Sequence, residues 1–172
     1  MQEQTNDYIF NISKDPVKFV EALANVEPNV IYGFCHDRYK PTTDAYKKIG
    51  DKIKNTSTSL IFTDVRIQSV DIVSTEYYPS FYPGIHEHFL IHSPIFVLPN
   101  MSVDISHNPE IQLYFSHEFF IQLSNYYFPT HIPEPLFTFH ANASDENSVR
   151  NDINIFHGTQ SDSKSDGVLQ TP

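Results

Sequence analysis

The chain has very little cysteine: Cys35 is the only one in 172 residues, which also include 5 glycines and no tryptophan. A single cysteine excludes an internal disulfide and any site built from a cysteine pair. No stretch approaches the roughly 18 consecutive apolar residues of a membrane helix, and the first residues, MQEQTNDY, have neither the basic nor the apolar part of a signal segment. We therefore expect no membrane span.

Basic residues are also scarce, with 11 Lys and Arg against 21 Asp and Glu and a net charge of −10. Such a charge repels phosphate backbones and anionic lipid, which excludes nucleic acid as a partner. The lone cysteine favours a reducing compartment. Glycosylation sequons favour the opposite and occur at Asn11, Asn55, Asn100 and Asn142. Localisation is therefore open: the cytoplasm, or the endoplasmic reticulum lumen if a signal peptide was removed.

The first half of the chain predicts alternating helices and strands. Asp15 and Pro16 begin a helix that Pro28 ends, and the apolar run 30–34 after it is typical of a strand buried on both faces. A second amphipathic helix over 42–55 and a second buried strand over 59–67 follow. Two strands joined through a helix are expected to be parallel, so the fold class is α/β.

The second half begins with an irregular insertion over 69–92, rich in Tyr and Phe. Pro94 then opens a third strand, the run 109–115 predicts an antiparallel fourth strand, and Ser116 is expected to cap a final helix. We expect one domain over 1–129. Residues 130–140 are predicted to form an extended arm docked on it, and the polar residues 141–172 to be disordered.

Three stretches carry a resemblance to a known family: DPVKFVEALANVEPNVIYGFC, HSPIFVLP and IQLYFSHEFFIQLSNYY. In order and pattern they resemble the thioredoxin-like fold of protein disulfide isomerase-type domains, over residues 8–129. The resemblance implies a central mixed sheet of four to five strands flanked by helices, with the aromatic insertion before a strand that begins with a cis-proline. It implies no cofactor.

The resemblance also places a degenerate active site. The family has Cys-x-x-Cys where this chain has Cys35-His36-Asp37-Arg38, so dithiol turnover is not expected. If Cys35 capped a helix beside His36 and Arg38, its thiolate would be stabilised and could exchange with glutathione or a partner thiol. The alternative is an inert buried cysteine.

The same resemblance implies a cis bond between Ser93 and Pro94, which would expose backbone to an extended client. Tyr78 and Phe81 in the aromatic insertion then become candidate residues of a hydrophobic lip, or a cover for the core. The histidines of HEHFLIH do not have a strong zinc spacing, so no metal site is predicted there. Asp37 and Asp64 show no spacing that indicates acid and base catalysis.

The sequence thus favours a protein- or peptide-binding module without dithiol redox turnover. Two alternatives stay open at this point: a monothiol exchange enzyme that uses Cys35, and a scaffold domain with one fixed partner.

Overall fold

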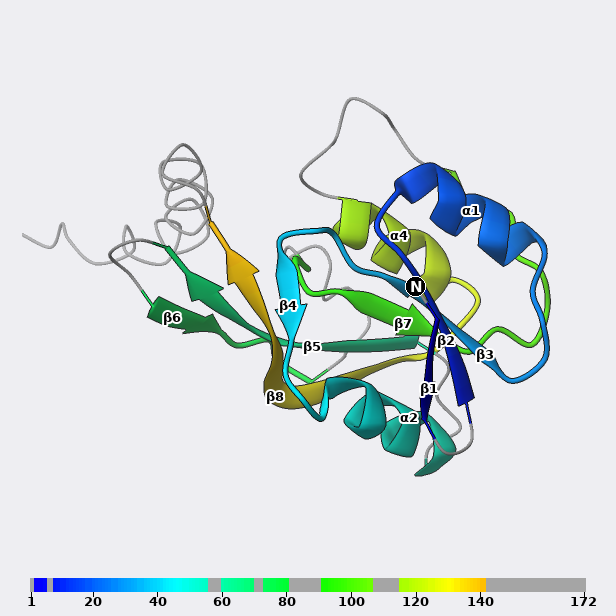
Figure 1. Ribbon diagram of the computed structural model, residues 1–172. Coiled ribbons are helices and arrows are strands. Elements are labelled where there is room, and N and C mark those ends of the chain that lie inside the picture. The colour runs from blue at the N-terminus through cyan, green and yellow to red at the C-terminus, as the bar shows by residue number, and fades with distance from the viewer. Residues whose placement is uncertain are drawn as a thin grey trace, which may run out of the picture.

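Figure 1 shows the computed structural model, which describes residues 2–5, 8–55, 60–69, 73–80, 91–106 and 115–141. The helices are α1 (Pro16–Ala24), α2 (Ala45–Asn55) and α4 (Phe115–Ser124). The strands are β1 (Gln2–Thr5), β2 (Tyr8–Ser13), β3 (Val30–Phe34), β4 (Tyr39–Pro41), β5 (Leu60–Gln68), β6 (Val73–Glu76), β7 (Ile95–Val97) and β8 (Pro129–His140). None of the helices in this part of the chain is long and apolar enough to cross a membrane.

The strands form one mixed sheet of eight strands in the order β1-β2-β3-β7-β5-β8-β4, with β6 paired to β5. The expected α/β class is confirmed, but the expected count of four to five strands is too low. Strands β3 and β5 run in the same direction, as predicted, because each is antiparallel to β7. The unexpected feature is that β7 lies between them.

Helices cover both faces of the sheet: α1 and α4 lie on one face and α2 on the other (Figure 1). Helix α1 begins where the sequence predicts, because the Asp15 carboxylate accepts hydrogen bonds from the backbone amides of Val17 at 2.8 Å and Lys18 at 3.4 Å. Its Phe19 and Leu23 are buried against the sheet.

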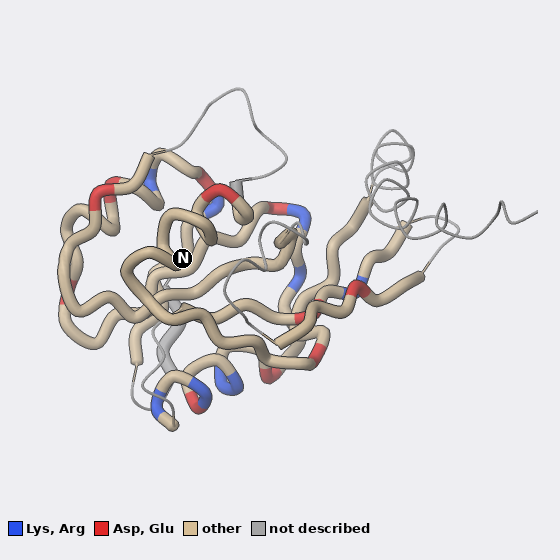
Figure 2. The backbone as a smooth tube through the Cα atoms, turned by 180° about the vertical axis from the view of Figure 1, so that it is seen from behind, with Lys and Arg blue, Asp and Glu red and all other residues tan. Residues whose placement is uncertain are grey.

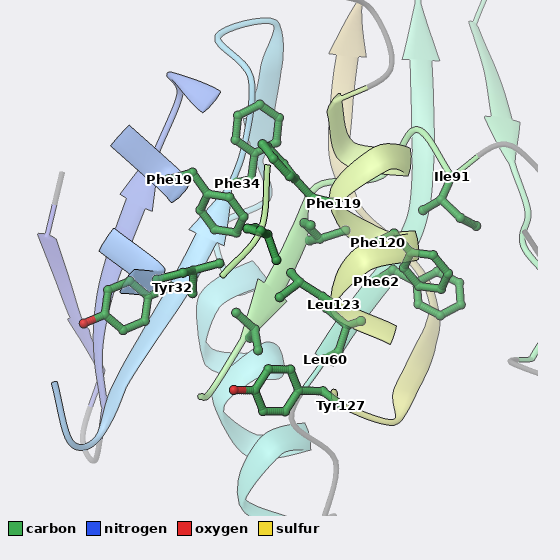
Figure 3. Packing of buried hydrophobic residues seen from close by; sticks show 14 of the residues in the cluster. Phe19, Tyr32, Phe34, Leu60, Phe62, Ile91, Phe119, Phe120, Leu123 and Tyr127 are labelled. Carbon is green, nitrogen blue, oxygen red and sulfur yellow. The ribbon is translucent and has the colours of Figure 1, made fainter. Parts of the chain in front are cut away.

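Strand β3 is buried along its whole length and feeds two hydrophobic clusters, one on each face. Val30, Tyr32 and Phe34 belong to the cluster under α1 and α4, whereas Ile31 and Cys35 belong to the cluster over α2. The alternation follows from the two-residue period of a strand. In Figure 3 the Phe19, Phe34 and Phe119 rings meet in the first cluster, with Phe34 and Phe119 centroids 5.1 Å apart.

Gly33 lies directly opposite Phe96 of β7, and the Phe96 ring occupies the space beside it. A Cβ atom at position 33 would lie 2.7 Å from two ring carbons of Phe96. Because no real contact is that short, the second cluster requires glycine at this position.

The segment 130–140, predicted as an arm docked on the surface, is strand β8 within the sheet. It pairs with β5 from Leu60 to Gln68, with an irregular register between Thr63 and Val65. Leu136 and Phe137 are buried, as their apolar character predicts. The arm prediction failed because β5 is long enough to leave one edge open for a strand that arrives from the far end of the chain.

Beyond that irregularity the sheet continues as what we call the extension: residues 65–68 of β5, β6, residues 137–140 of β8, and β4. It projects past the helices in Figure 1. We call the rest of the sheet, together with the three helices, the body.

The expected cap of the last helix is not found. Ser116 does not cap the last helix, since α4 begins at Phe115 and the Ser116 side chain is buried within its first turn.

The predicted fourth strand falls largely on 109–114, which lies outside the described residues. Phe81 of the aromatic lip and the tail 142–172 also lie outside them.

Candidate functional site

Cys35 follows β3 directly, at the end of the sheet where β7 begins. The β3–β7 register pairs Phe34 with Ile95 as its last position, so Cys35 and Pro94 each lie one residue beyond that pair, at the same end of the two strands.

The surroundings of Cys35 do not activate its thiol. The residue is 5% exposed, and burial raises the pKa of the thiol to about 12. Lys14 opposes this rise and Asp37 adds to it, but both are minor because they form an exposed ion pair with each other at 2.6 Å. At neutral pH the Cys35 sulfur therefore stays protonated.

The predicted helix at Cys35 is not there, which removes the expected source of positive potential. Helix α2 begins at Ala45, and the chain between them turns and forms β4. Arg38 lies 6.0 Å over the ring of Phe139 and His36 is exposed. Although His36 is exposed, its ring is partly shielded from water by neighbouring atoms. This desolvation, followed by the Arg38 charge, lowers the pKa of His36, so His36 supplies little positive charge to the thiol at neutral pH.

Ser93 and Pro94 are not arranged to meet a client. No peptide bond in the described residues is cis, so the bond between Ser93 and Pro94 is trans. Ser93 is fully buried: its hydroxyl accepts from the Thr63 amide at 3.0 Å and donates to the Pro94 carbonyl at 2.8 Å. The predicted exposure of backbone here is wrong, because the bond is trans and Ser93 is fully buried.

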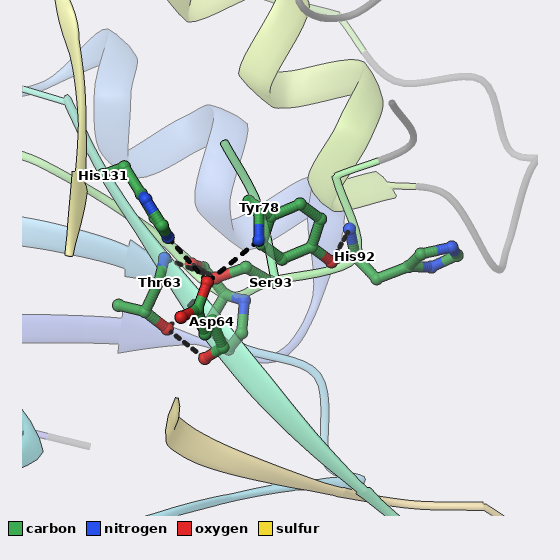
Figure 4. Close-up of polar contacts among 7 residues, drawn as sticks. Thr63, Asp64, Tyr78, His92, Ser93 and His131 are labelled. Carbon is green, nitrogen blue, oxygen red and sulfur yellow. Dashed lines mark hydrogen bonds and ion pairs between the residues drawn. The ribbon is translucent and has the colours of Figure 1, made fainter. Parts of the chain in front are cut away.

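A buried polar network lies beside this point, and sequence reasoning missed most of it. The Asp64 carboxylate of β5 lies 2.7 Å from Nε2 of His131 on β8, with both side chains at most 5% exposed (Figure 4). The same carboxylate oxygen accepts from the Tyr78 amide at 3.0 Å. His131 stacks on the Phe62 ring at 5.0 Å.

The network continues through tyrosine hydroxyls to the backbone of His92. The Tyr78 hydroxyl accepts from the His92 amide at 3.1 Å and is also bonded to the Glu76 carboxyl. The Tyr39 hydroxyl donates to the His92 carbonyl. Burial raises the pKa of Glu76 to about 7, and the bond from Tyr78 only partly opposes this.

This network joins strands through buried polar side chains. Asp64 has two partners, the histidine ring is packed against Phe62, and Tyr78 is buried, so the residues that meet here join β5, β8, Tyr78 and the backbone of His92. Among the described residues no three His, Cys, Asp or Glu side chains lie together in a way that could hold a metal ion. A buried Asp in the middle of an apolar strand was the available signal, since such a group requires a partner.

Strand β6 forms one edge of the extension. Within the described strands β6 pairs only with β5, in antiparallel register from Val65–Glu76 to Gln68–Val73. Val73 is 68% exposed, and Tyr77, which follows the strand, is 73% exposed. Tyr78, the predicted lip residue, is 6% exposed and faces the network.

Strand β6 therefore inverts the usual alternation of an edge strand. The two-residue period of a strand places Val73, Thr75 and Tyr77 on one side. Glu76 and Tyr78 belong to the other side and take part in the network. Apolar side chains face solvent and an acidic side chain faces inward.

Comparison with known proteins adds no family to this description. No family model matches the chain, and no curated protein matches it. The site must therefore be interpreted from its own geometry.

Proposed function

We propose that this protein is a binding module for an extended segment of a protein or peptide client, and that it works without dithiol redox turnover. The observation that carries the proposal is the exposed apolar side of β6, where Val73 begins the strand and Tyr77 directly follows it, and the outer edge of this strand is unpaired in the described sheet. Exposed apolar side chains on an open edge are a recurrent means of capturing extended chains.

The state of Cys35 supports binding in preference to thiol exchange. A buried thiol with a pKa of about 12 supplies almost no thiolate at neutral pH, and thiolate is the attacking species in disulfide exchange. No observation favours monothiol turnover or a bound glutathione.

The relationship to thioredoxin-like, protein disulfide isomerase-type domains is part of this proposal. Its support is the chain order of α1, β3 followed by Cys35, α2, β5, a strand that follows Pro94, and α4. The additional strands and the trans bond at Pro94 are departures from the pattern.

A peptide array tests the function. Wild-type protein is incubated with an array of extended peptides of varied sequence, beside the double variant Val73→Ser, Tyr77→Ser. We expect that the wild type binds a subset of peptides and that the variant loses most of that binding while its circular dichroism spectrum is unchanged.

The matched control is Met101→Ser with Tyr126→Ser, which are 54% and 50% exposed and lie outside the extension. This control is expected to keep the wild-type binding pattern. Equal loss in both double variants, or no peptide bound by folded wild type, would contradict the proposal. Tyr78 is unsuitable for such a test because its replacement would disturb the buried network.

A further inference from the structure

The sheet face of the extension that carries Val73 and Thr75 also carries a row of directly opposed residues across all its strands. Lys40 of β4 lies opposite Thr138 of β8, Thr138 opposite Arg66 of β5, and Arg66 opposite Thr75 of β6. Directly opposed residues project from the same face of a sheet, so this row crosses one face. Lys40 and Arg66 are both exposed.

The next row on this face is His140, Gln68 and Val73. Neither row contains an acidic residue, although the chain has a net charge of −10. Figure 2 shows charged positions gathered along α2 and the loops, and mostly uncharged positions over the extension. Among the described residues, no ion pair is formed by Arg66 or Lys40 with any carboxylate.

The two side edges of the extension differ in their openness to a further strand. Strand β4 has Lys40 at its centre and ends at Pro41, which has no backbone N–H group. Lysine and proline are the residues by which edge strands resist pairing. Strand β6, with the sequence VSTE, contains neither.

From these observations we propose that the client adds as a strand to the outer edge of β6 and that it carries an acidic residue between two apolar ones at alternate positions. This rests on the proposed function and specifies its ligand. The apolar residues would lie against Val73 and Tyr77, and the acidic residue opposite Thr75.

Charge and distance select the acidic residue at the central position. A residue opposite Thr75 lies two strand spacings from Arg66, about 10 Å between Cα atoms. The side chains of Arg and Glu together bridge that distance over the short Thr75 side chain. Lys40 is two strands further from the edge, about 19 Å from the same position, and does not reach it.

The test uses the full chain and capped nine-residue peptides in which valine, glutamate and valine occupy alternate positions among serines, with lysine replacing glutamate in a second peptide. Fluorescence anisotropy is expected to give about 3- to 10-fold tighter binding of the glutamate peptide, as one partly exposed charge pair can supply. Arg66→Glu should reverse the preference, and Lys40→Glu, the matched control on the same face, should keep it.

Strand addition itself is tested by N-methylating the glutamate peptide at alternate backbone amides, in two registers. Only one register of a strand faces the edge to which it pairs, so one N-methylated peptide is expected to lose binding at least tenfold and the other to retain it.

The outcomes separate the two proposals. Peptides that bind equally well with glutamate or lysine, or that tolerate both N-methylated registers, overturn this inference and leave the proposed function standing. Absence of binding by any peptide on the array overturns both. A stable dimer in sedimentation that Val73→Ser dissociates would show that a second copy of the chain occupies the edge, and would also overturn the inference.

Discussion

The body and the extension of this sheet differ in how deeply their strands are buried. All five residues of β3 in the body are buried between helices, and the strand has a neighbour on each side. In the extension no residue of β4 or β6 is fully buried, and the last three residues of β5 are exposed or half-buried. The body therefore accounts for most of the core, whereas the extension carries strands whose side chains are exposed or half-buried.

The two polar features of the molecule show the same contrast. Cys35, the most conspicuous residue of the sequence, is enclosed by the body and keeps its proton. The Asp64–His131 pair lies where β5 passes from the body into the extension, next to the irregular register of β5 and β8. We infer that this pair fixes the direction in which the extension leaves the body.

The largest expected effect is at that junction. Asp64→Ala leaves buried His131 and the Tyr78 amide without their partner, and we expect the free energy of unfolding to fall by about 3–5 kcal/mol. Urea denaturation followed by circular dichroism measures this. In the control Asp37→Ala, which removes an exposed ion pair, the midpoint should stay near that of the wild type. Equal midpoints for the two variants would show that the junction is not held by Asp64.

Glu76 should make the stability of the extension depend on pH. Burial raises the pKa of Glu76 from its ordinary value of 4.5 to about 7 in the folded protein, so the folded state holds the proton more tightly than the unfolded state does. Stability is therefore fully present below about pH 4.5 and falls as pH rises to above 7, by about 3 kcal/mol.

Glu76→Gln should remove that fall, since glutamine does not titrate and can still bond to the Tyr78 hydroxyl. Urea midpoints from pH 5 to 8 measure the slope for both proteins. The same slope in wild type and variant would assign the pH dependence to other groups.

Gly33→Ala tests the packing of the body. The new methyl group meets the Phe96 ring, and we expect a loss of about 1–3 kcal/mol from overpacking. Adding Phe96→Leu should recover part of the loss, because leucine leaves room for the methyl group. Thr75→Ala in the extension is the control, with an expected change below about 0.5 kcal/mol. A larger loss at Thr75 than at Gly33 would reverse our comparison of the two regions.

The smallest effect concerns thiol reactivity. We expect Cys35 in the folded protein to react with a thiol-specific dye far more slowly than after unfolding in urea, with a rate that still rises above pH 9, because its pKa is about 12. A rate that reaches a plateau below about pH 8.5 would show an activated thiol and would favour the monothiol alternative over binding.

Much of the body could be predicted because its signals are local. Asp15 and Pro16 mark the start of α1, the apolar run 30–34 marks β3, and the helical spacing of Ala45, Ile49 and Ile53 marks α2. The extension could not be predicted in this way. Its strands are short or polar, and β8 reads as an arm until β5 is known to offer it an edge.

The candidate site divides along the same line. Element order placed Cys35 at the end of β3, but it did not give the chemistry of the thiol, because burial and helix position decide a thiol pKa. The Asp64–His131 pair joins residues that are 67 positions apart, and nothing local to either one indicates the other.

The amino-acid sequence alone determined the α/β class, the lack of any second thiol and the helices and strand of the body, since composition, caps and hydrophobic period act within a few residues. Only the tertiary structure decided that Cys35 is enclosed, that Asp64 meets His131 and that, among the described strands, β6 pairs only with β5. These depend on which strands become neighbours, and strand pairing joins residues that are distant in the chain.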